Sequence, residues 1–217
     1  MSRSIRVAIS GGGLAGASLL HALLNFPHLD VHVFESAAAF KEAGMAIGLT
    51  RNAQAALDLT SPSAAQLLQR AGAVPMRGVR FMIAQSEGQG EVIDEIDDIT
   101  AGKRLTSIVH RAAYLKELLA GVPQERMHAS KKLDKVDRND DGSIMLHFAD
   151  GTTHECDILI GADGIHSAVR KLILGDDLAA QPRNSVPHLE FPSFFPRIPL
   201  FPLKTTLIYV NTSYHLN

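Results

Sequence analysis

The sequence lacks several features that would each point to a class of protein. It has one cysteine in 217 residues, which excludes an internal disulfide framework and predicts a reducing compartment, the cytoplasm. It has no run of about twenty apolar residues free of charge and proline, so we expect no membrane-spanning helix. The net charge of -2 provides no excess of basic residues for nucleic acid or an acidic membrane. The ten histidines have no metal-ligand spacing, and we predict no metal site.

What is present suits a folded domain that begins with a strand. Apolar residues make up 46% of the chain and charged residues 20%, enough to bury one core or a little more. An apolar strand over 5–10 leads into Gly11, Gly13 and Gly16 at G-x-G-x-x-G spacing, and a helix is predicted over 14–25. This order is typical of a dinucleotide-binding βαβ unit.

Each glycine of the motif has a separate physical task. Gly11 lets the chain turn tightly out of the strand, Gly13 lets the backbone approach a pyrophosphate, and Gly16 lets the helix pack against the sheet. The helix N-terminus, which begins with Leu14 and Ala15, offers unpaired N–H groups and a partial positive charge to the phosphates. The motif therefore predicts that a dinucleotide binds here.

Glu35 directly follows the second predicted strand, 31–34, and lies nineteen residues after Gly16. This is near the usual distance for a carboxylate that accepts the adenosine ribose hydroxyls, and a carboxylate would repel a 2′-phosphate, which leaves FAD or NAD. A secretory signal peptide is a rival interpretation of the basic, apolar N-terminus. The glycines at 11–13 would break its helical core, and we expect no signal.

Further elements follow from periodicity and turn residues. A loop is expected over 36–48, with Gly44 and Gly48 as its hinges, and Thr50 or Asn52 is expected to cap the helix after it. The other predicted helices lie at 63–70, 111–120 and 167–174, and the other predicted strands at 79–84, 91–96, 131–137, 143–148, 152–155 and 157–161.

One of these elements suggests a ligand, and another predicts the centre of a parallel sheet. Arg111 begins a predicted helix although the helix dipole favours anions there, which hints at an anionic ligand nearby. The strand over 157–161 is apolar throughout, as expected for a central parallel strand. It runs directly into Ala162, Asp163 and Gly164.

Together the motifs resemble one family. The glycine motif with Glu35, His110-Arg111 at a helix start and the stretch from Asp157 to Arg170 closely resemble the single-component FAD-dependent aromatic hydroxylases related to salicylate hydroxylase. The resemblance covers about residues 4–181. It implies a Rossmann-like FAD-binding domain over 1–181 that includes part of a β-rich substrate-domain sheet around 75–106.

The resemblance also implies roles for individual residues. The glycine motif would receive the FAD pyrophosphate and Glu35 the adenosine ribose, while Arg111 would reach the bound FAD. Asp163 and Gly164 would touch FAD and help to accommodate NAD(P)H, and Gly48 would lie in a loop near the flavin. The implied activity is NAD(P)H-dependent hydroxylation of a small aromatic substrate, with the redox chemistry supplied by FAD.

Residues 182–217 differ from the rest of the chain. Six of the ten prolines and four of the nine phenylalanines lie between 182 and 202, and prolines at this density disfavour both a helix and a central strand. We therefore expect an aberrant tail and a C-terminally truncated fold. Apolar strand surface would then be left uncovered, and efficient hydroxylation would not be expected.

Two alternatives stay open at this stage. A non-catalytic FAD- or nucleotide-binding fragment would keep the same N-terminal motifs. An NAD-dependent dehydrogenase would share the first βαβ unit, although it has no reason to carry the stretch at 161–164 before a helix.

Overall fold

In the computed structural model, the described residues are 4–41, 44–60, 63–82, 90–97, 104–175 and 206–209. They divide into two compact units. The first unit combines residues 1–40 with 122–217, and the second comprises 41–121. Each unit is described by itself.

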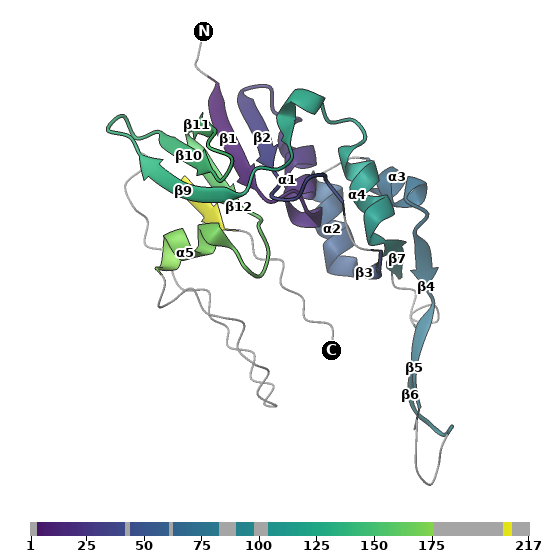
Figure 1. Cartoon of the computed structure of the whole chain (residues 1–217). Coiled ribbons are helices and arrows are strands. Elements are labelled where there is room, and N and C mark those ends of the chain that lie inside the picture. The colour runs from purple at the N-terminus through teal and green to yellow at the C-terminus, as the bar shows by residue number, and fades with distance from the viewer. Residues whose placement is uncertain are drawn as a thin grey trace. The chain divides into compact units, whose positions relative to one another are not determined.

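The first unit is built on a five-stranded parallel sheet with the order β13-β12-β1-β2-β8 (Figure 1). The strands are β1 (Ile5–Ser10), β2 (Leu29–Phe34), β8 (Met127–His128), β12 (Ile158–Gly161) and β13 (Thr206–Tyr209). The chain leaves β1 through α1 (Leu14–Leu23) and leaves β12 toward α5 (Ala168–Leu174). Strand β1 lies between β2 and β12, and its residues Ala8 and Ile9 are fully buried, as expected for a central parallel strand whose two faces are covered.

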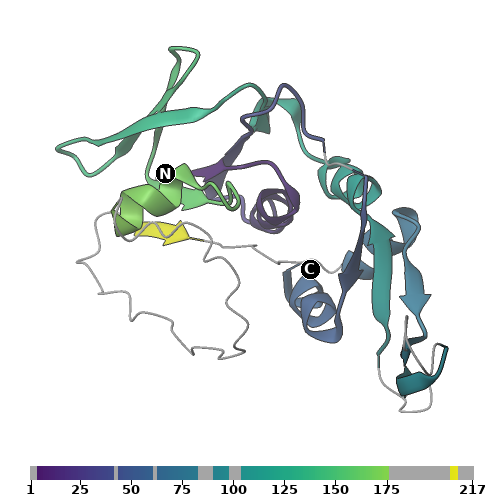
Figure 2. The same ribbon diagram turned by 60° about the horizontal axis from the view of Figure 1, so that its bottom comes forward.

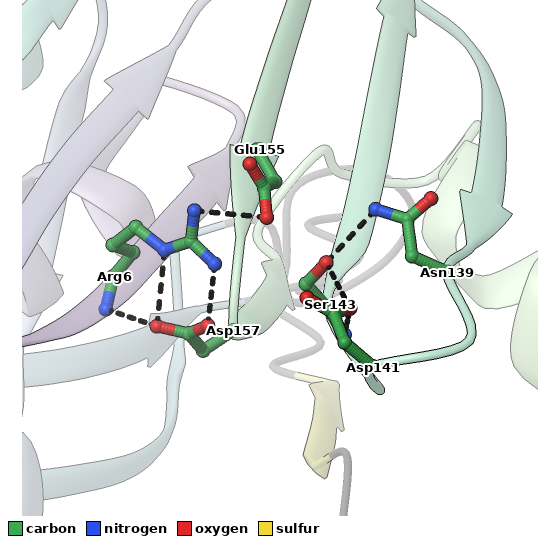
Figure 3. A network of polar contacts seen from close by, with 6 residues as sticks. All are labelled: Arg6, Asn139, Asp141, Ser143, Glu155 and Asp157. Carbon is green, nitrogen blue, oxygen red and sulfur yellow. Dashed lines mark hydrogen bonds and ion pairs between the residues drawn. The ribbon is translucent and has the colours of Figure 1, made fainter.

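A three-stranded antiparallel sheet completes the first unit. It consists of β9 (Leu133–Arg138), β10 (Ile144–Phe148) and β11 (Thr153–Cys156) in the order β11-β10-β9. The short helix η1 (Gln124–Arg126) precedes β8. The β9–β10 turn closes on itself, because Asp141 accepts hydrogen bonds from the N–H and Oγ of Ser143, and Asn139 donates to that Oγ (Figure 3). Apolar residues of β10 pack in one cluster with Phe34 and Leu159.

An ion-pair cluster fastens β1 to the start of β12 (Figure 3). The Arg6 guanidinium donates to both carboxylate oxygens of Asp157, at 3.2 and 2.7 Å, and lies 3.0 Å from Glu155. The Asp157 carboxylate also accepts from the Arg6 backbone N–H at 2.8 Å. These acceptors raise the pKa of Arg6, Asp157 contributing most. Two segments about 150 residues apart are thereby held in register.

The second unit contains three helices and two small sheets among its described residues (Figure 2). The helices are α2 (Arg51–Thr60), α3 (Ala64–Arg70) and α4 (Arg111–Leu119). One sheet has the order β3-β7-β4, with β3 (Ala46–Leu49), β7 (Thr106–His110) and β4 (Val74–Met76). The other is the antiparallel pair of β5 (Gly78–Met82) and β6 (Val92–Asp97). Of the helices in the described part of the chain, none is long and apolar enough to cross a membrane.

Most predicted elements are present within a few residues of their expected ends. The expected loop over 36–48 is wrong at its end, because β3 begins at Ala46 and Gly48 lies inside a strand paired with Ile108. Strands β4 and β7 were not predicted. One strand of the tail is described: β13 lies beyond the last proline, Pro202, and pairs with β12. The other tail residues lie outside the described part.

Candidate dinucleotide-binding site

The predicted binding motifs meet at the carboxyl ends of three neighbouring parallel strands. Gly11 follows β1, Glu35 follows β2, and Ala162 with Asp163 follows β12. Strand β1 pairs with both of the others. The sheet continues from β2 to β8 on one side of β1 and from β12 to β13 on the other. In open α/β sheets, ligands bind at the carboxyl ends of the strands where the strand order reverses in this way.

Gly11 is required where the glycine motif after β1 contacts the residues that follow β12. Its φ of +104° is a conformation that residues with a Cβ rarely adopt. A Cβ at this position would lie 2.3 Å from the carbonyl oxygen of Ala162 and 2.8 Å from the Cα of Asp163. The tight turn predicted for Gly11 is confirmed. The same glycine leaves room for Ala162 and Asp163, which follow β12, to approach this turn.

The N-terminus of α1 lies directly after this turn. Gly13 is its N-cap, no side chain caps the helix, and its first turn contains no acidic residue. A Cβ on Gly16 would lie 1.9 Å from the Gly11 carbonyl oxygen, so the predicted close packing of the helix is confirmed. Leu14 and Ala15 form the first turn, whose N–H groups have no intrahelical acceptor. Such a helix start is suited to an anion.

Glu35 faces the glycine turn. Its Oε2 accepts a hydrogen bond from the Gly12 N–H at 2.7 Å, and its Oε1 accepts from the Ala37 N–H at 2.7 Å and from the Ser36 hydroxyl at 3.1 Å. A carboxylate has about four lone-pair sites, so acceptor capacity is left for a further hydroxyl. The backbone of Glu35 is fixed as well, because its N–H donates to the His128 carbonyl and its carbonyl accepts from Lys131.

Asp163 holds the start of α5. Its carboxylate accepts from the Ser167 hydroxyl at 2.5 Å and from the N–H groups of Ala168 and Val169 at 2.7 and 3.2 Å. Ser167, fully buried, accepts in turn from the Arg170 N–H. The sequence analysis missed the capping role of Ser167, although a serine directly before the helix body is an ordinary capping signal. Gly164 follows with a φ of +76° and open space around its Cα.

The other two predicted residues lie in the second unit. Gly48 is in β3, where a Cβ would lie 3.3 Å from the side chain of Thr106. Arg111 is the first residue of α4, half-buried, and its N–H donates to the Met45 carbonyl beside the start of β3. The structure thus places Arg111 and the β3 segment together. Their contact with FAD stays a prediction.

Three histidines gather near Phe34 in the first unit. His32 Nδ1 and His128 Nε2 are 2.9 Å apart, and the ring of His154 lies 5.3 Å from that of His32 and 4.7 Å from that of Phe34. Burial lowers the pKa of all three, that of His154 to about 4, and their mutual repulsion adds to the effect for His128 and His154. Among the described residues, no group of three or more potential ligand side chains could hold a metal ion.

Comparisons with known proteins identify relatives. No family model matches the chain. The 6-methylsalicylate 1-monooxygenase of Aspergillus terreus is 37% identical over 185 residues, which span 81% of this chain and 41% of the relative. The salicylate hydroxylase of Pseudomonas putida is 33% identical over 179 residues, which span 82% of this chain and 40% of that enzyme. The N-terminal part of this chain belongs with the FAD-dependent monooxygenases.

Two solved structures share the fold of this chain over about four-fifths of its length. A salicylate hydroxylase solved as a substrate complex is 25% identical with a TM-score of 0.61, over 79% of this chain and 38% of that one. The HpxO protein of Klebsiella pneumoniae, solved with FAD and uric acid, is 24% identical with a TM-score of 0.66, over 79% of this chain and 42% of that one. The chain spans about two-fifths of the length of the curated relatives it matches.

Proposed function

We propose that this chain binds FAD, with the adenosine diphosphate half at the carboxyl end of the first unit's sheet. The observation that carries the proposal is the start of α1, where the N-cap Gly13 has no capping side chain, beside the Glu35 carboxylate just after the neighbouring strand β2. The donors fit the ligand, because a helix start binds pyrophosphate and a carboxylate binds ribose hydroxyls. The relatives that are named FAD-dependent monooxygenases support FAD over NAD.

Each predicted residue has a place in this proposal. Gly11, Gly13, Leu14, Ala15 and Gly16 would hold the pyrophosphate through the turn and the helix start. Glu35 would accept the ribose hydroxyls. Arg111, Gly48, Asp163 and Gly164 would contact the rest of FAD, with Asp163 acting through backbone it fixes, because its carboxylate is committed to α5.

The activity we propose is NAD(P)H-dependent hydroxylation of a small aromatic substrate in the cytoplasm. It rests on the relatives, two of which are named for salicylate or 6-methylsalicylate. Bound FAD supplies the redox chemistry, while the residues of this chain bind and orient it.

Titration with FAD and with NAD tests the cofactor. Flavin fluorescence and calorimetry should show that FAD binds more tightly than NAD. Preference for NAD would support a dehydrogenase and overturn the proposal. Replacing Arg111 by alanine should weaken FAD binding about tenfold, since a charge-assisted hydrogen bond contributes roughly 1.5–3 kcal/mol. Unchanged affinity would make Arg111 a surface residue of α4.

An activity assay tests the reaction. NAD(P)H oxidation is followed with a panel of hydroxybenzoates while hydrogen peroxide and hydroxylated product are both measured. We expect reductant to be consumed mainly with peroxide release, because the chain matches only about two-fifths of the length of its relatives and a reaction that water can reach loses its coupling to hydroxylation. Coupled hydroxylation on the order of 1 per second or faster would show that the chain builds a complete substrate site, and no consumption at all would favour a non-catalytic binding role.

A further inference from the structure

The ring of Phe40 lies against the glycine turn. A Cβ built on Gly12 would lie 2.4 Å from Cε1 and 2.5 Å from Cδ1 of Phe40, and 3.0 Å from the Cβ of Glu35. The Phe40 ring and the Glu35 side chain therefore flank the same side of Gly12. No real Cβ could occupy this space without moving the ring, so Gly12 provides room for Phe40.

The same place holds a hydrogen bond that fixes the carboxylate. The Gly12 N–H donates to Glu35 Oε2 at 2.7 Å, and the Ala37 N–H holds the other oxygen. Glu35 and Phe40 are both half-buried. An apolar ring beside a hydrogen bond keeps water from competing for its donor and acceptor and strengthens it by lowering the local dielectric.

We propose that Phe40 is a positioning residue of the dinucleotide site. Its ring covers the Gly12–Glu35 hydrogen bond and holds the carboxylate in the orientation that receives the ribose hydroxyls. The inference rests on the proposed function and adds to it a residue outside the glycine motif. Phe40 acts through Glu35 and needs no contact of its own with the ligand.

This role has a signature that ordinary packing does not have. Without the ring, Glu35 gains rotamers and water reaches its oxygens, so the loss falls on recognition of the ribose hydroxyls. The pyrophosphate is held by the turn and the start of α1, which the ring does not replace. The ratio of affinities for ADP and 2′-deoxyADP therefore reports on Phe40, whereas general damage to the site would weaken both nucleotides equally.

The experiment measures that ratio by calorimetry, well below the unfolding temperature, for the wild type, Phe40→Ala and Phe40→Leu. The wild type should prefer ADP by about tenfold, the value of one charge-assisted hydrogen bond. Phe40→Ala should reduce the preference to about twofold and Phe40→Leu to roughly fourfold, because leucine restores part of the apolar cover. Phe26→Ala is the matched control: Phe26 is 50% exposed, and the ratio should not change.

Two results would overturn the inference. An unchanged ratio in Phe40→Leu, or in a folded Phe40→Ala, would show that the ring does not position Glu35, even if both affinities fall. Failure of the folded wild type to bind either nucleotide would overturn the proposed function and this inference with it. The first result leaves the proposed function intact, so the two failures are distinguishable.

Discussion

Two helices of the first unit begin in similar surroundings and end up with different partners. Both α1 and α5 follow a buried parallel strand and a glycine-containing turn. At α5, Asp163 and Ser167 together accept hydrogen bonds from three backbone N–H groups of the first turn. At α1 the N-cap is Gly13, which has no side chain to accept a hydrogen bond from the first turn.

The difference separates a structural helix start from one suited to a ligand. Backbone N–H groups at a helix start need an acceptor. Where the protein supplies acceptors, as at α5, the helix start contributes to stability. At α1 the N-cap provides no acceptor side chain, and the nearby Glu35 carboxylate follows β2. The N–H groups of this helix start are therefore suited to a phosphate as their partner. The comparison predicts that removing the acceptors at the start of α5 alters stability, whereas removing the groups that face the ligand at the start of α1 alters binding.

The largest effect is expected from Gly16→Ala. Alanine is favoured over glycine in a helix by about 1 kcal/mol, yet here its Cβ would lie 1.9 Å from the Gly11 carbonyl oxygen. Because backbone has to move, we expect a loss of about 3 kcal/mol in the free energy of unfolding, measured by urea denaturation, together with loss of nucleotide binding. Gly121→Ala is the control, since nothing lies within 4 Å of its Cβ. Equal stability of the two variants would refute the packing role.

Asp163→Ala should separate the two helix starts. Removal of the carboxylate leaves two N–H groups and a buried hydroxyl without their acceptor, which should cost about 2 kcal/mol of unfolding free energy. ADP affinity should stay within about threefold. Asp140→Ala, at an exposed position in the β9–β10 turn, serves as the control. A large loss of ADP affinity with unchanged stability would mean that Asp163 serves the ligand and not α5.

A smaller effect is expected from pH, on the β2 side of the sheet. The pKa of His154 is lowered to about 4 by burial and by His32 and His128, whose own pKa values are also lowered. The unfolded chain therefore binds protons that the native state does not, so stability is complete above pH 6.5 and falls as the pH drops toward 4.

Urea denaturation at several pH values measures this slope. His154→Phe keeps an aromatic ring beside Phe34 and should flatten the pH dependence, while His28→Gln, at an exposed position, should leave it unchanged. A slope that His154→Phe does not alter would place the acid sensitivity elsewhere.

Local signals explain what the sequence revealed and what it did not. Strand β1, helix α1 and Glu35 were predictable because period, glycine spacing and order are all contained in one stretch of 31 residues, 5–35. Strands β3 and β7 were not, because they are four and five residues long and pair across the second unit. The role of Asp163 at the start of α5 was also not predictable, because an acidic residue at this place in the sequence is compatible with either a ligand contact or a helix cap. The Arg6–Asp157 pair joins positions 151 residues apart, which no local pattern marks.

Calorimetric titration of FAD into the wild type and Glu35→Gln tests the central claim most directly. Glutamine keeps the size of the side chain and removes the charge from the groups that face the ribose. We predict measurable FAD binding by the wild type, about tenfold weaker binding by Glu35→Gln, and unfolding free energies within about 1 kcal/mol of each other. Equal FAD affinity of the two proteins would contradict a ribose site at Glu35, and absence of binding to the folded wild type would contradict the account as a whole.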